Sequence, residues 1–379
     1  MNEQQSKEVL ERFQAGTDSP QENQQVRYWL HHLHEDQPSD LSETFLRDTH
    51  DEMWSFILLQ TQPTTTVKTT RLPLRIVLAA ASVVAILGIC IYFFTKEPSD
   101  NRFANNILPG TDKATLILSN GDKISLNEAK NGVLALQSTM KVIKSEGGEI
   151  IYTSRPDPAP YTNGARNQES ETKNVNTMIT PRGGQYKLSL PDGTKVWLNA
   201  ASTLTYPVSF AGRKERRIEL KGEAYFEVVK DKMHPFLVQS KTQVVKVLGT
   251  HFNISSYPDD ASTQTTLVEG SVLVNMVALK PGQQAVNSGS LIKVRSVDPD
   301  GVIAWKNGEF SFRNEPLERI MKQLSRWYDV DVVYQNQQAG SQLFGGTISK
   351  YKDISKVLRM LELTGDVKFK MEGRKVFVQ

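Results

Sequence analysis

The chain has 379 residues and a mass of 42.6 kDa, more than a single hydrophobic core usually holds, so we expect two or three domains. A mean hydropathy of −0.40 with 23% charged residues excludes a protein that is membrane-embedded throughout, and any membrane segment must be a local exception. The net charge is +3, but residues 1–62 carry 4 Lys and Arg against 12 Asp and Glu, which disfavours nucleic acid as a direct partner of this region.

Residues 1–62 predict a small all-α head of three short helices. The second helix has the clearest start, with Ser19 as N-cap, Pro20 in the first turn and Glu22 closing a capping box. Its apolar face has the spacing of an amphipathic helix and consists of Val26, Trp29, Leu30 and Leu33. Three short helices make a thin core, so we expect a partner or a homodimer of the head to help bury Trp29 and Trp54.

After a juxtamembrane linker at 63–75, residues 76–94 form an uncharged apolar run of 19 residues. A helix of this length spans roughly 28 Å, enough for one membrane crossing. It is preceded by a long polar region, which argues against a cleaved signal peptide. The flanking basic residues favour a cytoplasmic N-terminus only mildly; they are Lys68, Arg71 and Arg75 before the run and Lys96 and Arg102 after it. The only cysteine, Cys90, lies inside the run, so neither side depends on disulfides.

Beyond this run the pattern alternates with period two, as in strands. Residues 95–153 predict a segment containing a β-hairpin, with strands at 115–118 and 123–126 around the turn Asn120-Gly121. The sequence LSNGDKISLNEA at 118–129 is similar to LPDGTKVWLNAA at 190–201, which fits either an internal duplication or two turns of the same chemistry. Residues 154–177 are polar and Pro-rich without periodicity, and predict an exposed linker.

Residues 178–297 predict a compact all-β domain of short strands, which the pattern assigns equally to a sandwich, a barrel or a short β-solenoid. Residues 303–379 predict a small α+β domain of order β-α-β-β-α-β-β. Its first helix begins at Pro316 and its second ends at Gly365. The inward faces of these helices are predicted to be Leu317, Ile320, Met321, Leu324 and Trp327, and Ile354, Val357, Leu358 and Leu361.

The sequence contains no common catalytic signature: the P-loop, G-x-S-x-G, H-E-x-x-H and C-x-x-C patterns are all missing. His31 and Glu35 stand one helical turn apart, but no other ligand group accompanies them, so a solvated face is the simpler interpretation. We therefore predict no catalytic, cofactor-binding or metal-binding residues, and a protein that is not an enzyme.

Several long blocks of the sequence resemble the periplasmic domain of FecR-type anti-sigma regulators. The blocks are PRGGQYKLSLPDGTKVWLNAASTLTYP at 181–207, LKGEAYFEVVKD at 220–231, PFLVQS at 235–240 and VLGTHFNISSY at 247–257. The resemblance continues through TTLVEGSVLV at 265–274, LKPGQQA at 279–285, AWKNGEFSF at 304–312 and LSRWYDVDVVY at 324–334. Together these blocks cover about half of the chain.

The resemblance implies a single-pass inner-membrane protein with a cytoplasmic N-terminus and a periplasmic C-terminus. Its head would hold an extracytoplasmic-function sigma factor, and its periplasmic part would contact the N-terminal signalling domain of an outer-membrane TonB-dependent receptor. The head matches by position, acidity and helicity only; its predicted sigma contacts are Val26, Trp29, Leu30 and Leu33.

The C-terminal domain looks like the short N-terminal domains of secretins and TonB-dependent receptors. Such domains could pair through strand edges, and the predicted receptor-contact edge is Lys375, Val376, Phe377 and Val378. Some members of the family are self-cleaved at a Gly-Thr bond, which makes Gly249-Thr250 a possible cleavage site. A tight turn at a strand end explains the same pair.

The main alternative is a membrane-anchored envelope scaffold or ligand-binding protein whose head is only a structural cap. An adjacent sigma-factor gene would favour the anti-sigma interpretation. An anchored hydrolase is disfavoured by the missing nucleophile signature, and activity of the soluble part on generic ester or peptide substrates would revive it.

Overall fold

The computed structural model describes residues 106–137, 139–154 and 174–379, together with Val9, Arg12, Ser19 and Phe103. Apart from three isolated positions, the predicted head, linker and membrane helix at 1–94 lie outside the described residues, as does most of the predicted linker at 154–177. The chain divides into two units, Met1–Lys96 and Glu97–Gln379. Within the part that is described, no helix is both long and apolar enough to cross a membrane.

Residues 111–296 form a β domain. Its first strands are β1 (Thr111–Asp112), β2 (Thr115–Ile117), β3 (Lys123–Ser125), β4 (Gly132–Gln137), β5 (Met140–Lys144) and β6 (Ile150–Ser154). Then come β7 (Val175–Thr180), β8 (Gly184–Ser189), β9 (Lys195–Leu198), β10 (Ser202–Pro207), β11 (Arg216–Glu227), β12 (Phe236–Ser240) and β13 (Gln243–Val247). The last are β14 (His251–Ser256), β15 (Thr263–Glu269), β16 (Val272–Val274), β17 (Val277–Leu279), β18 (Gln283–Asn287) and β19 (Ile292–Ser296).

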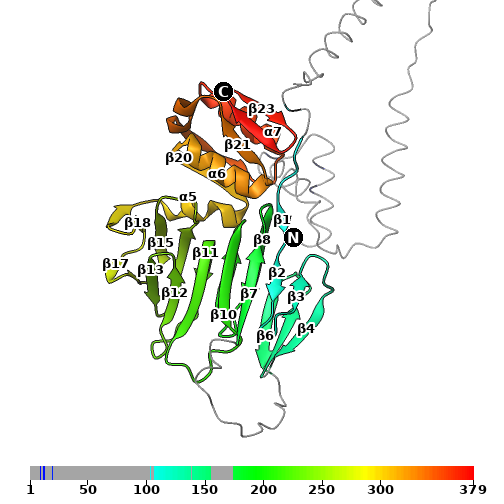
Figure 1. The fold of residues 1–379 in the computed structure, drawn as a ribbon, viewed down its shortest axis with the longest axis vertical. Coiled ribbons are helices and arrows are strands. Elements are labelled where there is room, and N and C mark those ends of the chain that lie inside the picture. The colour runs from blue at the N-terminus through cyan, green and yellow to red at the C-terminus, as the bar shows by residue number, and fades with distance from the viewer. Residues whose placement is uncertain are drawn as a thin grey trace, which may run out of the picture. The chain divides into compact units, whose positions relative to one another are not determined.

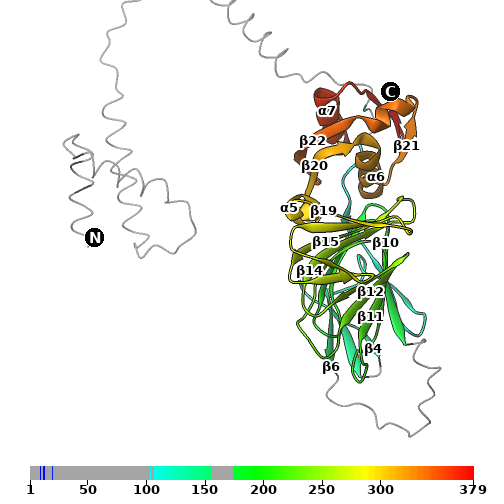
Figure 2. The same ribbon diagram turned by 90° about the vertical axis from the view of Figure 1, so that its left-hand side faces the viewer.

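These strands build two sheets that share the long strand β11 (Figures 1 and 2). One sheet has the order β3-β2-β7-β10-β11-β12-β13-β16-β17. The other has the order β4-β5-β6-β8-β9-β11-β14-β15-β18-β19. The first half of β11 pairs in one sheet and the second half in the other, with Gly222 at the crossing. The arrangement is sandwich-like, which the sequence pattern leaves open.

A single core fills the β domain, because both sheets bury alternate side chains in one cluster. Ile218 and Leu220 from the first half of β11 and Phe226 from the second half belong to it. Leu116 and Ile150 belong to it as well, and β2 pairs directly with β7. The described residues of 111–154 are therefore part of the β domain. The expected boundaries place them in a segment of their own.

The two similar sequence stretches form the same kind of hairpin. In the β2–β3 hairpin Gly121 N donates to Leu118 O at 2.8 Å, and in the β8–β9 hairpin Gly193 N donates to Leu190 O at 2.9 Å. Both glycines have positive φ, +93° and +83°, which an L side chain rarely adopts. The predicted hairpin at 115–126 is confirmed, and the two stretches share the same turn geometry.

A C-terminal domain follows after α5 (Pro299–Ile303) and η3 (Ala304–Asn307). Its elements are β20 (Glu309–Pro316), α6 (Leu317–Tyr328), β21 (Asp331–Tyr334), η4 (Gln337–Ser341), β22 (Leu343–Ser349), α7 (Ile354–Thr364), β23 (Phe369–Glu372) and β24 (Lys375–Val378). The predicted order and the inward faces of both helices are confirmed, since all of those apolar residues are buried in one cluster. This domain lies at one end of the β strands (Figure 1).

The predicted receptor-contact edge at Lys375, Val376, Phe377 and Val378 is wrong as an edge. These residues form β24, which pairs in parallel with β21 and antiparallel with β23. β24 is therefore the central strand of a three-stranded sheet. Val376 and Val378 are fully buried, and a central strand has no free backbone groups to offer a partner.

Candidate functional site at the domain junction

The sequence blocks that carry the family resemblance supply side chains to one place, where the β domain meets the C-terminal domain. We call this place the junction and define it by Arg182, Glu223, Asn253, Tyr257, Trp305, Arg326 and Lys350. The first four come from the β domain, Trp305 from the connection, and the last two from α6 and the end of β22. No single element holds the junction, so its integrity depends on both domains being folded and docked.

Trp305 anchors the connection between the domains. Its side chain is 8% exposed and packs with Tyr225 and Ile303, and its Nε1 donates to Asn253 Oδ1 at 3.2 Å. The next residue, Lys306, places its Nζ 4.6 Å from the ring centres of both Trp197 and Tyr225. Because a buried tryptophan with a satisfied N–H is costly to move, the start of the C-terminal domain is fixed to the β domain.

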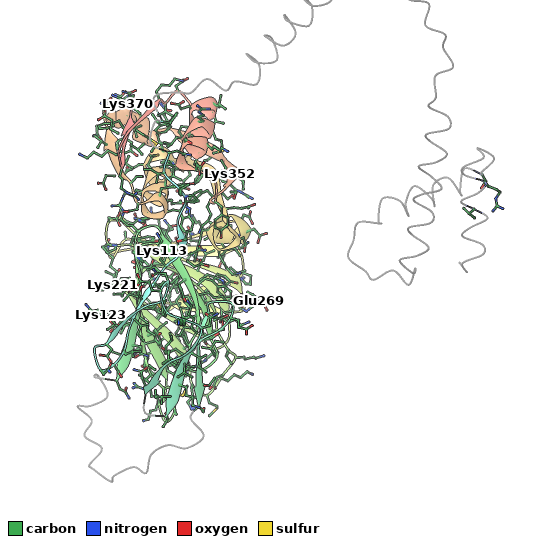
Figure 3. The ribbon with its side chains drawn as sticks, turned by 90° about the vertical axis from the view of Figure 1, so that its right-hand side faces the viewer. Lys113, Lys123, Lys221, Glu269, Lys352 and Lys370 are labelled. Carbon is green, nitrogen blue, oxygen red and sulfur yellow. The ribbon has the colours of Figure 1, made fainter. Side chains whose placement is uncertain are left out.

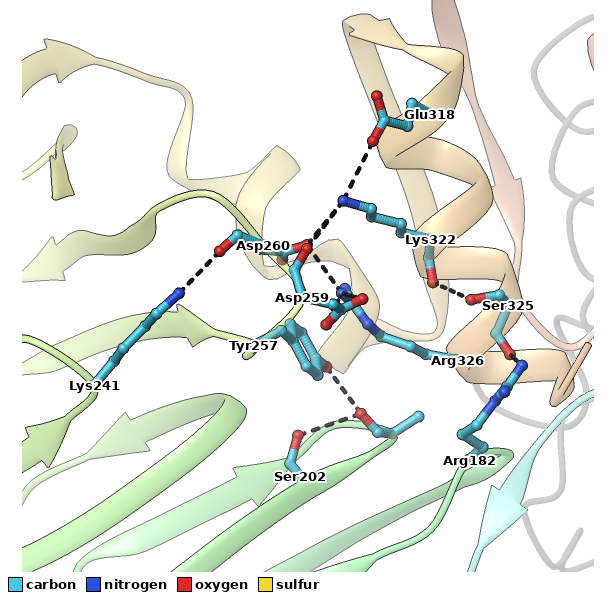
Figure 4. A network of polar contacts seen from close by, with 11 residues as sticks. Arg182, Ser202, Lys241, Tyr257, Asp259, Asp260, Glu318, Lys322, Ser325 and Arg326 are labelled. Atoms are coloured by element: carbon cyan, nitrogen blue, oxygen red, sulfur yellow. Dashed lines mark hydrogen bonds and ion pairs between the residues drawn. The ribbon is translucent and has the colours of Figure 1, made fainter. Parts of the chain in front are cut away.

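Arg326 on α6 reaches across to the loop after β14 (Figure 4). Its Nη2 donates to Asp259 Oδ2 at 2.8 Å and to Asp260 Oδ1 at 3.0 Å. Its guanidinium also lies over the Tyr257 ring, 3.6 Å from the centre, while Tyr257 donates its hydroxyl to Ala200 O at 2.9 Å. The Arg326 side chain is only 11% exposed, whereas Asp259 is 61% and Asp260 28% exposed. The guanidinium is therefore largely buried, and its charge-assisted contacts link α6 to the β domain.

Arg182, in the turn before β8, binds the C-terminal end of α6. Its Nη2 donates to Ser325 O at 3.3 Å and to Val330 O, and its Nε lies 3.2 Å from Asp329 Oδ1. Gly183 N in the same turn donates to Arg326 O at 2.8 Å. A cation at the carboxyl end of a helix satisfies its free carbonyls and complements its dipole. The PRGG turn therefore completes a helix of the other domain.

Glu223, just after the crossing in β11, is the carboxylate at the centre of the junction. Its two oxygens accept hydrogen bonds from Asn253 Nδ2 at 3.0 Å and from Asn199 Nδ2 at 2.8 Å. Burial raises the pKa of Glu223, and the two amide donors oppose this rise. A small cavity of about 20 Å³ lies beside it, bounded also by Lys350 and Trp327, which is room for one water molecule.

Lys350 is the most deeply buried cationic side chain of the described residues, at 1% exposure. Its Nζ donates to Gln185 Oε1 at 2.7 Å and to Trp305 O at 3.0 Å, and lies 3.7 Å from the Trp327 ring centre. Burial lowers the pKa of Lys350 to about 7, although Glu223 and Asp112 favour its charged form. The ammonium group therefore links both domains and the connection, in an environment that penalises its charge.

We expect the stability of the protein to rise between about pH 7 and pH 10 because of Lys350. Its pKa in the folded state is lower than in the unfolded state, so the unfolded state binds more protons in this window and loses that advantage as pH increases. The full effect is on the order of 5 kcal/mol. Lys350→Met should flatten this part of the pH profile of unfolding free energy, measured by urea titration of the full chain.

The control for this experiment is Lys352→Met, since Lys352 projects from the surface of the C-terminal domain (Figure 3). Removing that exposed charge should leave the slope between pH 7 and pH 10 as in the unmodified chain. Equal slopes for Lys350→Met and the unmodified chain would contradict the assignment of the proton uptake to Lys350.

A cleft with a volume of about 560 Å³ lies next to the junction, between the end of the β domain and the outer face of β20 and α6. Its lining mixes both charges with amides: Glu223, Asp260 and Glu315 oppose Arg295, Arg319 and Arg326, among Gln264, Gln284 and Gln323. The arginines have partners within the fold; Arg295, for example, donates to Gln284 Oε1 at 2.6 Å. The cleft is polar, and its arginine side chains are already bonded to other residues of the fold.

The predicted cleavage pair Gly249-Thr250 lies between β13 and β14. Gly249 has φ of +150°, and a Cβ on it would lie 2.7 Å from Lys230 Cα, so both backbone and packing require glycine there. Thr250 is buried and donates its hydroxyl to Ser271 O at 2.9 Å. These contacts are those of a tight turn. Cleavage stays a prediction, and a single full-length band after expression in membranes would count against it.

The predicted sigma contacts Val26, Trp29, Leu30 and Leu33 lie outside the described residues. In the ranges that the structure describes, no three His, Cys, Asp or Glu side chains gather as metal ligands would. Sequence reasoning missed the junction as a site. The sequence did contain a clue, because the blocks of family resemblance include Arg182, Glu223, Asn253 and Trp305. These polar or aromatic residues are not explained by the alternating pattern of the strands.

Comparison with known proteins agrees with the sequence blocks. Residues 176–273 match the family model described as FecR protein, and residues 309–378 match the model described as FecR, C-terminal. Two crystal structures of a candidate anti-sigma factor from Parabacteroides distasonis, at 1.65 and 2.50 Å resolution, are similar to this chain. Each has a TM-score of 0.51 and 28% identity, over 54% of this chain and 98% of the other. A search of curated proteins found no match. The chain therefore contains a FecR region and a FecR C-terminal region, in this order and joined at the junction, which confirms the resemblance seen in the sequence blocks.

Proposed function

We propose that the protein is an inner-membrane anti-sigma factor that sequesters an extracytoplasmic-function sigma factor in the cytoplasm. In this proposal it relays a signal from an outer-membrane TonB-dependent receptor to that sigma factor. The matches to both FecR models and the likeness to a candidate anti-sigma factor support the role. The apolar run at 76–94 and the acidic region at 1–62 supply the membrane helix and the head that the role needs.

The observation that carries the proposal is the docking of the two FecR regions through the junction. Arg326 and Lys350 of the C-terminal domain bind groups of the β domain and the connection at 2.7–3.0 Å. A receptor that binds the C-terminal domain would therefore act on the rest of the periplasmic part through direct contacts. Relay through packed elements needs such a physical connection.

The receptor contact is better assigned to the outer strands of the C-terminal domain than to β24. In the described part of the chain β21 and β22 each have one strand neighbour, so each has a free edge. Leu343 at the start of β22 is 62% exposed and Val333 in β21 is 37% exposed. A receptor strand could add to either edge, with main-chain hydrogen bonds supplying affinity.

The first experiment tests the head with an extracytoplasmic-function sigma factor from the same organism, taken from beside this gene if one is encoded there. The full chain in detergent should retain it in a pull-down at moderate salt, and a chain lacking residues 1–62 should not. We expect Trp29→Ala to weaken retention about tenfold, because aromatic anchors dominate such interfaces. Intact binding by that variant would mean that the sigma factor contacts other residues of the head. Absence of binding by the folded full chain would contradict the anti-sigma proposal.

The polar cleft favours a second candidate, a membrane-anchored ligand-binding protein. Its volume of about 560 Å³ is in the range of small-molecule sites. Thermal stabilisation of the full chain by a small polar solute, together with no sigma binding, would support this second function.

A further inference from the structure

Phe103 and residues 106–112 lie along the C-terminal domain before the chain enters the β domain, and we call them the strap. Phe103 and Ile107 pack with the core cluster of the C-terminal domain, and Arg359 on α7 lies 5.8 Å from the Phe103 ring centre. Eight residues separate Phe103 from the end of the predicted membrane helix at Phe94. The strap is thus the first described part of the chain beyond that helix, and it is bound to the C-terminal domain.

The strap completes the start of α7. The side chain of Asp353, the N-cap residue of α7, makes no capping hydrogen bond to its own helix. Instead Ile354 N donates to Ile107 O at 3.2 Å, Asn106 Nδ2 donates to Asp353 Oδ2 at 2.8 Å, and Ser355 Oγ donates to Asn106 Oδ1 at 2.9 Å. Because the first amides of a helix need partners from outside it, α7 and the strap stabilise each other.

The strap then passes through the junction. A Cβ on Gly110 would lie 2.8 Å from Trp327 Cε3 and 2.9 Å from Gly183 O, so only glycine fits between α6 and the PRGG turn. Directly after it β1 pairs in parallel with β8, and Asp112 Oδ1 accepts from Gln185 Nε2 at 3.0 Å. The same Gln185 accepts the hydrogen bond from Lys350. A shift of α6 or α7 would therefore change the contacts of the strap.

We propose that the strap is a releasable connection that transmits the state of the C-terminal domain directly to the segment next to the membrane. In this arrangement a partner that displaces α7 removes the contacts of Asn106 and Ile107 and frees the chain up to Gly110. The signal then bypasses the two sheets of the β domain, which stay folded. The signalling role of the strap rests on the proposed anti-sigma function, whereas its contacts with α7 are part of the fold.

The test uses Asn106→Ala, which removes two hydrogen bonds to the start of α7 and leaves the buried core intact. Leu108→Ala is the matched control, because Leu108 lies in the same strap and is 73% exposed. Hydrogen exchange of the full chain in nanodiscs should show the hydrogen-bonded amides of Ile354 and Thr111 exchanging about tenfold faster in Asn106→Ala. Exchange in β11 should not change in either variant.

The second measurement uses a reporter gene that is driven by the sigma factor retained in the pull-down. Asn106→Ala should shift its output about fivefold toward the stimulated level without receptor signal, and Leu108→Ala should not. Unchanged exchange in Asn106→Ala would contradict the proposal that Asn106 holds the strap on α7. Faster exchange with normal reporter output and a normal receptor response would overturn its role in transmission. A reporter that is insensitive to deletion of the whole gene would contradict the proposed function, and the exchange data would still decide whether strap and α7 form one unit.

Discussion

Gly222→Ala should destabilise the β domain by about 2–5 kcal/mol, which is a large share of the stability of a typical domain. Gly222 lies where β11 passes from one sheet to the other and has φ of +95°. A Cβ there would lie 2.7 Å from Ser202 Cα and 2.6 Å from Ser202 Cβ in the neighbouring strand β10. The backbone strain costs about 1–2 kcal/mol, and forcing two strands apart in a packed core costs about 1–3 kcal/mol more.

Gly212→Ala is the matched control for this substitution. Gly212 also has a positive φ, +73°, but nothing lies within 4 Å of a Cβ built on it. It should therefore cost only the backbone strain, about 1–2 kcal/mol. Urea midpoints from pulse proteolysis of the full chain in detergent should fall by about 1–2 M for Gly222→Ala and by less than half of that for Gly212→Ala. Equal losses in the two variants would mean that β10 relaxes freely, and the steric argument would fail.

Elements with a strong local period were predictable from the sequence. The apolar residues of α6 and α7 recur with helical spacing, and every one of them is buried. Both hairpin turns were predictable as well, because Gly121 and Gly193 occupy the positive-φ position of the turn. In these cases the residue that fixes the structure lies within a few positions of the structure it fixes.

The topology of the strands was not predictable in the same way. The sequence KVFVQ alternates like any strand, and nothing local distinguishes a central strand from an edge. The place of β24 depends on β21, some forty residues earlier, which pairs with it in parallel. The assignment of residues 111–154 to the β domain likewise depends on the pairing of β2 with β7, which lie on either side of residues 155–173.

The junction and the strap were the least predictable features, since each contact joins residues far apart in the chain. Asn106 and Asp353 are separated by 247 positions, and Arg326 and Asp259 by 67. A single sequence holds no record of such pairs. The blocks of family resemblance point to the residues, but only the fold brings them together.

Arg326→Ala should uncouple the β domain from the C-terminal domain and lower the stability of their docked state by about 2–3 kcal/mol. The substitution removes charge-assisted hydrogen bonds to Asp259 and Asp260 and the stacking of the guanidinium on Tyr257. It leaves Asp260, which is 28% exposed, with the weaker contact to Lys322 at 3.7 Å. Calorimetry of the full chain should then show two separate transitions for the β domain and the C-terminal domain where the unmodified chain shows one.

Two further variants on α6 separate the loss of this network from a general effect of charge. Arg326→Lys keeps the charge but cannot contact both carboxylates and stack on Tyr257 at the same time, so it should fall between Arg326→Ala and the unmodified chain. Lys322→Ala, one turn earlier, removes partly exposed ion pairs at 3.4 and 3.7 Å and an exposed hydrogen bond to Asp259 O at 3.2 Å, and should cost about 1 kcal/mol without splitting the transition. If the domains still unfold together in Arg326→Ala, then Trp305, Arg182 and Lys350 suffice to dock them, and Arg326 contributes affinity between the domains but not their cooperativity.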